Sequence, residues 1–121
     1  MATDCFLSHD WGRDQLERDN HGRVAKICAG LKLRRVVPWF DEDCMSGDIV
    51  EKMCDGIDET NLFLVFITRN YCDKVKQNAN ANDNCKREFM YAYQQKTPTK
   101  MLAVVMEHDM RNPVVWKGPV G

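Results

Sequence analysis

The sequence predicts an α/β domain in which a parallel β-sheet carries helices on both faces. Short apolar runs alternate with segments of helical periodicity along the chain, and this alternation favours parallel strands joined by crossover helices. The run at residues 62–68 is continuously apolar, as is typical of a central strand covered on both sides. The 121 residues of the chain, with 44% hydrophobic and 29% charged content, suit one globular domain over residues 1–121.

The first strand and the first helix come from the first third of the chain. Asp4 to Ser8 is a short apolar run that ends in a polar segment, the form of a buried strand with a loop at its carboxyl end. A helix from Asn20 to Leu33 is predicted by four apolar residues at helical spacing, Val24, Ile27, Cys28 and Leu31. These four residues are expected to form the buried face of the helix.

The second strand, Arg35 to Phe40, contains Pro38. A proline cannot donate a ladder hydrogen bond, so this strand is expected at an edge of the sheet. After a loop that ends at Gly47, a second helix is predicted, with Asp48 as its N-cap and Glu51 three residues later. The apolar face of this helix consists of Ile49, Val50, Met53 and Ile57.

The second half of the chain supplies two more strands and a helix between them. Leu62 to Thr68 is the central strand, Met101 to Met106 is the fourth strand, and the residues after it are expected to form loops. Asn78 to Asn84 is polar and turn-forming, which predicts a loop. Glu88 borders the buried stripe of the next helix, at a rim where we expect partial exposure. That stripe consists of Cys85, Phe89 and Ala92.

An edge position for the second strand fits a flavodoxin-like sheet of order 2-1-3-4-5. In such a sheet, ligands bind outside the carboxyl ends of the strands, at the switch point between the first and third strands. Here Ser8 to Gly12 and Thr68 to Tyr71 are expected to form that crevice. Glu88 is expected on the helix that follows the third strand.

Charge and motif content exclude several classes of function. A formal net charge of −1, with charges of both signs interspersed, gives no positive field for nucleic acid or for an anionic membrane. The sequence contains no Gly-x-Gly-x-x-Gly and no P-loop motif, which excludes a Rossmann dehydrogenase and a P-loop enzyme. A response-regulator receiver needs an aspartate at the end of the third strand, where this chain has Ile67-Thr68-Arg69.

The cysteines and the hydropathy of the chain indicate a cytoplasmic protein. No secretory signal and no apolar run of membrane-spanning length is visible in the sequence. Three widely spaced histidines, away from any cysteine pair, predict no metal site. The cysteines lack Cys-x-x-Cys spacing and fall mostly inside predicted elements, so we interpret them as reduced thiols. They are Cys5, Cys28, Cys44, Cys54, Cys72 and Cys85.

Three motifs, in this order, resemble those of the Toll/interleukin-1 receptor (TIR) domain family: Ser8-His9-Asp10-Trp11-Gly12, Pro38-Trp39-Phe40-Asp41 and Asn84-Cys85-Lys86-Arg87-Glu88-Phe89. The first resembles the family's Phe-Ile-Ser-His/Tyr box, and the second resembles the strand that leads into its long loop. The third resembles the helix start where NAD-cleaving members carry Cys-x-x-Glu. The family domain has a fifth strand and a final helix, so we expect a single TIR domain truncated at its carboxyl end.

The resemblance implies a site for NAD+ around one catalytic carboxylate, Glu88. On the residues alone, a glutamate in the first turns of a helix is usually a solvated residue favoured by the helix dipole. Trp39 is expected beneath the nicotinamide or a base, or else half-buried against the first helix. Asp10 departs from relatives that have arginine there, which argues against a phosphate contact from this position. The substrate-binding residues that the resemblance implies are His9, Asp10, Trp11, Gly12, Trp39 and Cys85.

The resemblance further implies that the chain hydrolyses NAD+ to nicotinamide and ADP-ribose, or to a cyclic isomer. NAD+ is then a substrate, and no cofactor is held. Self-association, or association with other TIR domains, is expected in signalling, innate immunity or cell death; the alternative is a non-catalytic scaffold that signals by TIR–TIR interaction alone. The residues that correspond to the family's self-association loop are Asp41, Glu42, Asp43, Cys44, Met45, Ser46, Gly47 and Asp48.

Overall fold

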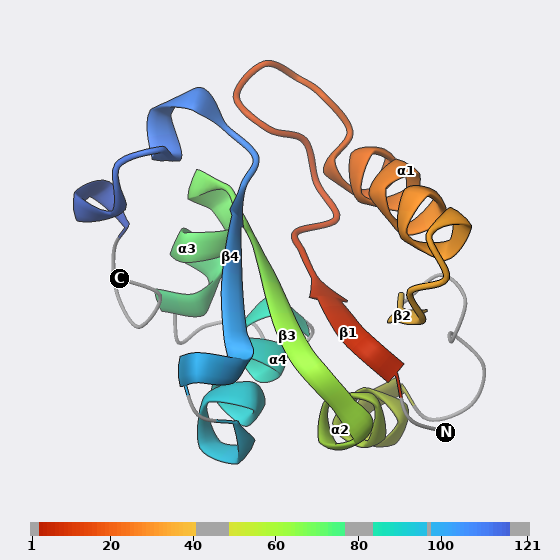
Figure 1. Cartoon of the computed structure of the whole chain (residues 1–121). Coiled ribbons are helices and arrows are strands. Elements are labelled where there is room, and N and C mark those ends of the chain that lie inside the picture. Colours follow the sequence, from red (N-terminus) through yellow and green to blue (C-terminus); the bar gives the residue numbers. More distant parts are fainter. Residues whose placement is uncertain (1–2, 41–48, 77–83, 97, 117–121) are drawn as a thin grey trace.

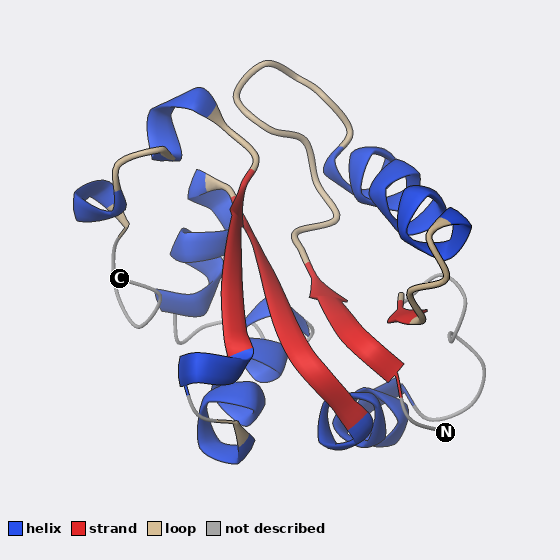
Figure 2. Cartoon of the chain, viewed as in Figure 1, coloured by secondary structure: helices blue, strands red, loops and turns tan. Residues whose placement is uncertain are grey.

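Four parallel strands form one sheet in the order β2-β1-β3-β4, with helices on both faces (Figure 1, Figure 2). The computed structural model of the chain describes residues 3–40, 49–76, 84–96 and 98–116. The parallel α/β fold and the order of the first four strands are as predicted. The strands are β1 (Thr3–Ser8), β2 (Pro38–Trp39), β3 (Thr60–Ile67) and β4 (Met101–Val105).

Two layers of helices cover the sheet. One face carries α1 (Asn20–Leu33), whose Val24 shares an apolar cluster with Leu7 of β1. Because side chains alternate along a strand, Phe6 and Ser8 of β1 point to the opposite face. That face carries three helices, α2 (Ile49–Glu59), α3 (Arg69–Lys76) and α4 (Asn84–Gln95).

Three of these helices were predicted. α1 has the predicted bounds, but its buried stripe follows the spacing Asn20, Val24 and Cys28 and leaves Ile27 exposed at the side, which corrects the predicted face. The predicted N-cap Asp48 and residues 78–83 of the predicted loop lie outside the described residues, and the last residue of that loop, Asn84, begins α4. α2 buries Met53 and Ile57 as predicted, whereas the side chains of Ile49 and Val50 lie outside the description; α4 buries its predicted stripe, Cys85, Phe89 and Ala92.

The second strand is shorter than predicted, because the chain wraps around the end of α1 before it enters the sheet. The amides of Arg34, Arg35 and Val36 donate hydrogen bonds to carbonyl oxygens in the last turn of α1. Arg35 has a φ of 64°, which an extended strand cannot contain. β2 is therefore two residues long, and it lies at the edge of the sheet as its proline predicts.

A helix that was not predicted, α3, separates β3 from α4. Thr68 precedes α3, and its hydroxyl oxygen accepts a hydrogen bond from the amide of Tyr71 at 3.1 Å, as an N-cap does. Tyr71, Cys72 and Val75 are buried against the sheet. The expectation that the helix of Glu88 follows the third strand directly is therefore wrong. Thr68 and the apolar pair at i and i+4, Tyr71 and Val75, were the available signal for this helix.

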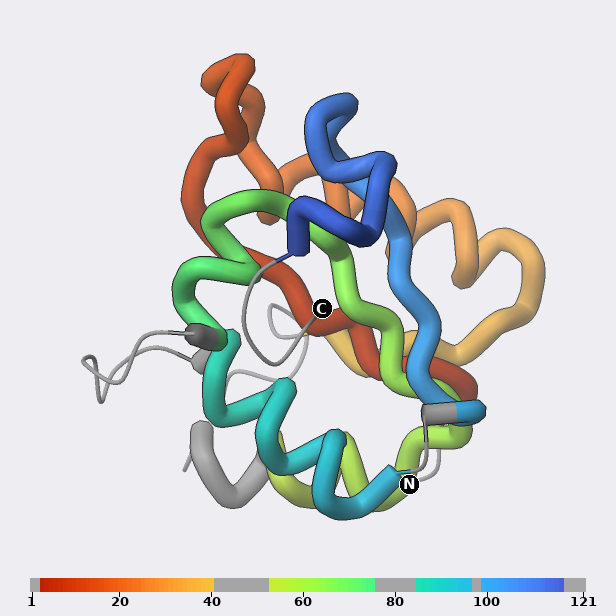
Figure 3. The backbone as a smooth tube through the Cα atoms, turned by 90° about the vertical axis from the view of Figure 1, so that its left-hand side faces the viewer, coloured from red at the N-terminus to blue at the C-terminus, as the bar shows by residue number. Residues whose placement is uncertain are grey.

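The segment after β4 contains two short 3₁₀ helices, η3 (His108–Met110) and η4 (Pro113–Val115), where loops were predicted; a third, η2 (Pro98–Lys100), precedes β4. Met110 is buried, and its carbonyl oxygen accepts a hydrogen bond from Trp116 Nε1 at 2.8 Å. Figure 3 shows the start of this segment close to the loop between β1 and α1, at the carboxyl end of the sheet. The described chain contains no strand beyond β4.

Candidate active site

Glu88 lies at the carboxyl end of β1, where two other buried side chains hold it. Ser8 Oγ donates a hydrogen bond to Glu88 Oε1 at 2.7 Å, and Ser8 Oγ lies 2.6 Å from the hydroxyl oxygen of Tyr71. Since the single hydroxyl proton of Ser8 goes to the carboxylate, Tyr71 donates to Ser8. Glu88 is only 2% exposed, so the prediction of a partly exposed rim position is wrong. The side chain of Tyr71, from the helix that was not predicted, helps to enclose it.

Tyr71 remains a hydrogen-bond donor because its surroundings oppose ionisation. Burial raises the pKa of Tyr71 well above its usual value, and the neighbouring Cys85 and Glu88 raise it further. The resulting chain runs from the Tyr71 hydroxyl through Ser8 to the Glu88 carboxylate, and it fixes the position of Oε1. Ser8 and Tyr71 were expected in the crevice, but nothing in the sequence indicated that they are partners of Glu88.

Cys85 joins the start of α4 to the loop after β1. Its thiol donates a hydrogen bond to the carbonyl oxygen of His9, with an Sγ–O distance of 3.4 Å, and its side chain is buried. Two of the predicted motifs, which are far apart in the sequence, therefore meet at the switch point. Through this contact, Cys85 anchors the start of α4, the helix that carries Glu88, to the loop after β1.

Trp39 lies on the same face of the sheet as Glu88, but most of its contacts are with the core. Its ring stacks on Phe6 with centroids 4.3 Å apart and an interplanar angle of 8°. On α2, a Cβ added at Gly56 would lie 2.6 Å from Trp39 Nε1, so only glycine leaves room for the indole. The alternative expectation of packing against the first helix is corrected, because the half-buried indole packs against α2.

His9 and His21 form a hydrogen-bonded pair on the α1 side of the site. His9 Nδ1 donates to the carbonyl oxygen of Leu7 at 2.9 Å, so Nε2 of the neutral ring accepts from His21 Nδ1 at 2.8 Å. His9 is 2% exposed, and burial lowers its pKa to about 4. The ring is therefore neutral at physiological pH. No sequence pattern linked His21 to this site.

Trp11 is the most exposed of the predicted substrate-binding side chains. It is 44% exposed, and its ring stacks on His21 with centroids 3.6 Å apart and an interplanar angle of 20°. Phe40 completes the group, at 5.4 Å from His9 and 4.9 Å from His21 between ring centroids. Stacked rings hold the indole in place, so Trp11 offers a fixed aromatic surface at the edge of the site.

Asp10 is buried beside the site and forms an ion pair with Lys74 of α3. The pair involves Asp10 Oδ1, whereas Asp10 Oδ2 has no hydrogen-bond partner among the described residues. A Cβ added at Gly12 would lie 3.1 Å from Asp10 Oδ2, so Gly12 keeps the space beside this oxygen open. Lys74 thus places a cation beside Asp10. No sequence signal indicated this pairing.

The loop between β1 and α1 is fixed by two buried carboxylates. Asp14 accepts hydrogen bonds from Arg18 Nε at 2.7 Å and Arg23 Nη1 at 2.9 Å. Glu107, which follows β4, accepts from the amides of Gln15 at 2.8 Å and Arg69 at 2.6 Å. These contacts tie the loop to the ends of β3 and β4, so residues 9–12 are presented on a rigid support.

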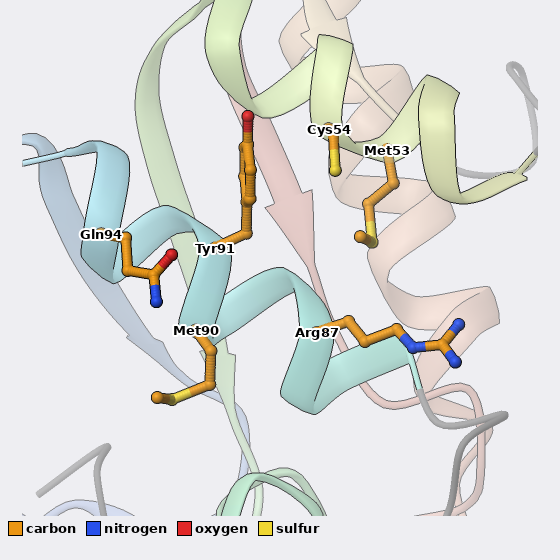
Figure 4. A pocket seen from close by; sticks show the side chains of 6 residues that line it. All are labelled: Met53, Cys54, Arg87, Met90, Tyr91 and Gln94. Atoms are coloured by element: carbon orange, nitrogen blue, oxygen red, sulfur yellow. The ribbon is translucent and has the colours of Figure 1, made fainter.

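A separate hollow of about 240 Å³ lies between α2 and α4 (Figure 4). The residues that line it from α4 recur at helical spacing on a face of the helix that does not include Glu88. The hydroxyl of Tyr91 donates to the carboxylate of Asp58 at 2.9 Å at one side. This hollow is distinct from the predicted site and is lined by Met53, Cys54, Arg87, Met90, Tyr91 and Gln94.

Clusters of metal ligands, membrane-spanning helices and disulfides are absent from residues 3–40, 49–76, 84–96 and 98–116. Within these ranges, His, Cys, Asp and Glu side chains do not gather in a group of three or more that could hold a metal ion. No helix there has the length and apolar character needed to cross a membrane. The five cysteines in these ranges form no disulfide. The predicted self-association loop, Asp41 to Asp48, lies outside the described residues.

A comparison of the sequence with known protein families agrees with the fold described above. No curated protein matches the chain. Residues 5–118 match the model of one family, described as the TIR domain, which is nearly the whole sequence. The match includes most of β1, the buried carboxylate on α4 and the last described strand. The chain therefore belongs to the TIR domain family, whose members act in signalling and associate through their TIR domains.

Proposed function

We propose that this TIR domain cleaves NAD+ to nicotinamide and ADP-ribose, or to a cyclic isomer, with Glu88 as the catalytic carboxylate. The observation that carries the proposal is the burial of Glu88 at the carboxyl end of β1, with Oε1 fixed by Ser8. Ligands of flavodoxin-like sheets bind at this end. A carboxylate that is buried at the ligand-binding end of such a sheet is a candidate for chemistry.

The chemistry requires little beyond one oriented carboxylate. Nicotinamide leaves NAD+ as a neutral molecule from a cationic pyridinium, so no general acid is needed. As the bond breaks, the ribose gains oxocarbenium character, which a fixed anion stabilises. Electrostatic stabilisation is stronger in a buried site than in water. The hydrogen bond from Ser8 holds the carboxylate in place before the reaction, so less reorganisation is required.

The predicted substrate-binding residues have supporting roles in this proposal. Trp11 offers an exposed ring for stacking, and Gly12 lets a ligand approach the backbone. His9 and Cys85 hold the loop and the helix together beneath the ligand. Trp39 supports the site from the core, so its contribution is to packing as well as to any contact with a base.

The proposal includes assembly in the cytoplasm. We propose that residues 41–48 form a self-association loop that contacts a neighbouring copy or another TIR domain. Release of nicotinamide per molecule is then expected to rise with protein concentration. A flat activity across a wide dilution series would instead indicate a self-sufficient monomer.

The test is nicotinamide release from NAD+ by concentrated protein, with Glu88→Gln as the variant. Glutamine keeps the size of the side chain and removes its charge, so release is expected to fall at least a hundredfold, which corresponds to about 3 kcal/mol. Glu59→Gln is the matched control, because Glu59 is an exposed glutamate at the end of α2, before the amino end of β3. Equal activity of both variants would refute the role of Glu88.

The alternative function is a non-catalytic scaffold. The hydrogen bond from Ser8 and the close packing of Glu88 favour it, since they give this residue a structural contribution as well. On that alternative, wild-type protein releases no nicotinamide at any concentration and still associates with other TIR domains. The same assay, combined with a measurement of self-association by light scattering, decides between the two functions.

A further inference from the structure

The end of α1 concentrates positive charge. Residues 20–37 contain five of the chain's 17 lysine and arginine residues and none of its 18 aspartate and glutamate residues. Four of these cations, Lys26, Lys32, Arg34 and Arg35, are exposed. The net charge of −1 for the whole chain therefore does not describe this part of the surface.

Two apolar side chains are exposed among these cations. Leu33 is 85% exposed and Val37 is 48% exposed. Cations in the last turn of a helix are ordinary, because they interact favourably with the helix dipole. The dipole gives no reason for an apolar side chain between them. The combination of the two kinds of side chain therefore needs a different explanation.

Arg35 has a backbone conformation that favours glycine. The amide of Val36 donates a hydrogen bond to the carbonyl oxygen of Leu31 at 3.0 Å, and the amide of Arg35 donates to that of Lys32 at 3.0 Å. This pattern is a Schellman motif, whose turning residue is left-handed and usually glycine. Arg35 has a φ of 64°, so its side chain destabilises the turn. Strain of this kind is common at functional positions, where a particular side chain is needed.

The exposed side chains at this end of the helix form one surface, which we call the α1-end patch. Lys26 and Leu33 lie on the same side of the helix, since seven residues make nearly two full turns. An 85% exposed leucine stands out from the surface and does not line a recess. The α1-end patch consists of Lys26, Lys32, Leu33, Arg34, Arg35 and Val37.

The α1-end patch adjoins the start of β1, away from Glu88. The amide of Val37 donates a hydrogen bond to Asp4 Oδ2 at 2.7 Å, and its carbonyl oxygen accepts one from the amide of Asp4 at 2.7 Å. Asp4 is an acidic neighbour of the patch, and this contact ties it to the backbone. α1 runs against the direction of the strands, so its end points away from their carboxyl ends (Figure 1). A large partner on the patch therefore leaves the candidate active site open.

We propose that the α1-end patch binds an anionic phospholipid surface. Cations around a protruding apolar side chain match a bilayer, which has negative headgroups at its surface and an apolar interior beneath them. Leu33 enters the acyl region, and Lys26, Arg34 and Arg35 contact the headgroups. An acidic protein segment would instead favour a recess for its own apolar side chains. Lipid binding at this patch does not depend on NAD+ cleavage.

The experiment is co-sedimentation of the whole chain with vesicles. Vesicles of phosphatidylcholine and phosphatidylserine in equal amounts are compared with vesicles of phosphatidylcholine alone. We expect binding to the anionic vesicles only, and weaker binding as the salt concentration rises, because salt screens exposed charges. Binding by one copy is expected to be weak, since the patch contains few cations and one strongly exposed leucine.

Leu33→Gln tests the apolar contact. The side chain is exposed, so the melting temperature should stay the same, whereas binding to anionic vesicles should weaken on the order of tenfold. Leu16→Gln is the matched control, because Leu16 is 71% exposed in the loop between β1 and α1, away from the patch. It should leave vesicle binding unchanged.

Arg35→Gly tests the strained cation. Glycine relieves the left-handed turn, so the melting temperature should rise, while the loss of one cation should weaken vesicle binding about fivefold. Glu17→Gly is the control for strain, since Glu17 has a φ of 60° and lies outside the patch. It should raise the melting temperature without weakening vesicle binding.

Three results would overturn the proposal. The first is that wild-type protein does not bind anionic vesicles. The second is that Leu33→Gln and Arg35→Gly bind them as wild type does. The third is that wild-type protein binds poly-glutamate through Arg35 and ignores vesicles, which would assign the patch to an acidic protein. Each of these results is separate from the nicotinamide assay.

Discussion

The two ends of the sheet differ in what they bury. At the amino end, the described chain buries few polar groups, namely the Thr60 side chain and the hydroxyl oxygen of Thr3. Burial of polar groups is unfavourable unless they are partnered, so an ordinary core avoids them. Their concentration at the other end is the reason that we place the proposed active site there. The buried polar and charged side chains there are Ser8, His9, Asp10, Asp14, Asn20, Thr68, Glu88 and Glu107.

The carboxyl end itself has two parts. Asp14 and Glu107 have several hydrogen-bond partners, and they fix the loop after β1 to the rest of the fold. Asp10 and Asn20 keep polar atoms without partners among the described residues. The carboxylates of Asp14 and Glu107 therefore stabilise the loop, whereas Asp10 and Asn20 add less to its stability. The following predictions test this division, from the largest expected effect to the smallest.

The largest effect is expected from Ser8→Ala, compared with Thr60→Val at the amino end. Ser8→Ala removes the hydrogen bond that orients Glu88, so kcat for nicotinamide release should fall on the order of a hundredfold, or about 2.7 kcal/mol. KM should change little, because Ser8 holds the carboxylate and is itself covered. Steady-state kinetics with NAD+ as the varied substrate give both constants.

Thr60→Val is the control for the loss of a buried hydroxyl, since Thr60 Oγ1 donates to the carbonyl oxygen of Leu62 at 3.1 Å. Both variants are expected to lose stability by about 1 kcal/mol, because each removes a buried hydrogen bond. Only Ser8→Ala should lose activity. Equal losses of activity in the two variants would mean that Ser8 acts through stability alone.

Gly56→Ala should destabilise the domain by about 2 kcal/mol, because the added methyl group overlaps Trp39. Chemical denaturation measures this change in the free energy of unfolding. Trp39→Phe in the same chain should recover part of the loss, since the smaller ring makes room for the methyl group. A double variant as unstable as Gly56→Ala would show that the contact with Trp39 is not the cause.

Most of the fold could be predicted because its signals are local. The apolar runs of β1, β3 and β4 and the helical spacing in α1, α2 and α4 depend on neighbouring residues. α3 was missed because its eight residues are mostly polar, so its buried pair, Tyr71 and Val75, gave a weak pattern. β2 was overestimated because the sequence does not show that Arg35 turns into a left-handed conformation.

The site was less predictable than the fold, because its contacts join distant residues. The resemblance to the family identified Glu88, but not the Ser8 and Tyr71 chain that holds it. Ser8 is 63 residues from Tyr71 and 80 residues from Glu88 in the sequence. Periodicity carries no information about such pairs, and the same holds for Asp10 with Lys74 and for His9 with His21.

His9 should make stability depend on pH in acidic solution. Its pKa is lowered from 6.5 to about 4 by burial, and His21, Asp10 and Asp19 face the ring. Between these two values the unfolded chain binds the additional proton, so stability falls as pH decreases, by about 1.4 kcal/mol per unit. Urea denaturation at pH 6.5, 5.5 and 4.5 measures the slope. His9→Gln should show a shallower slope, and an unchanged slope would exclude His9 as its source.

The smallest effect is expected for a substitution in the hollow between α2 and α4. This substitution tests whether nicotinamide release depends only on residues at the carboxyl end of the sheet. Gln94 is exposed and lines this hollow, on a face of α4 that does not include Glu88. Gln94→Lys should change stability by less than about 0.5 kcal/mol, as exposed substitutions usually do. Nicotinamide release should stay within about twofold of wild type, because the charge is added outside the buried polar groups. If release falls strongly while the melting temperature is unchanged, the hollow takes part in the active assembly. The surface of this hollow would then be needed for activity together with the carboxyl end of the sheet.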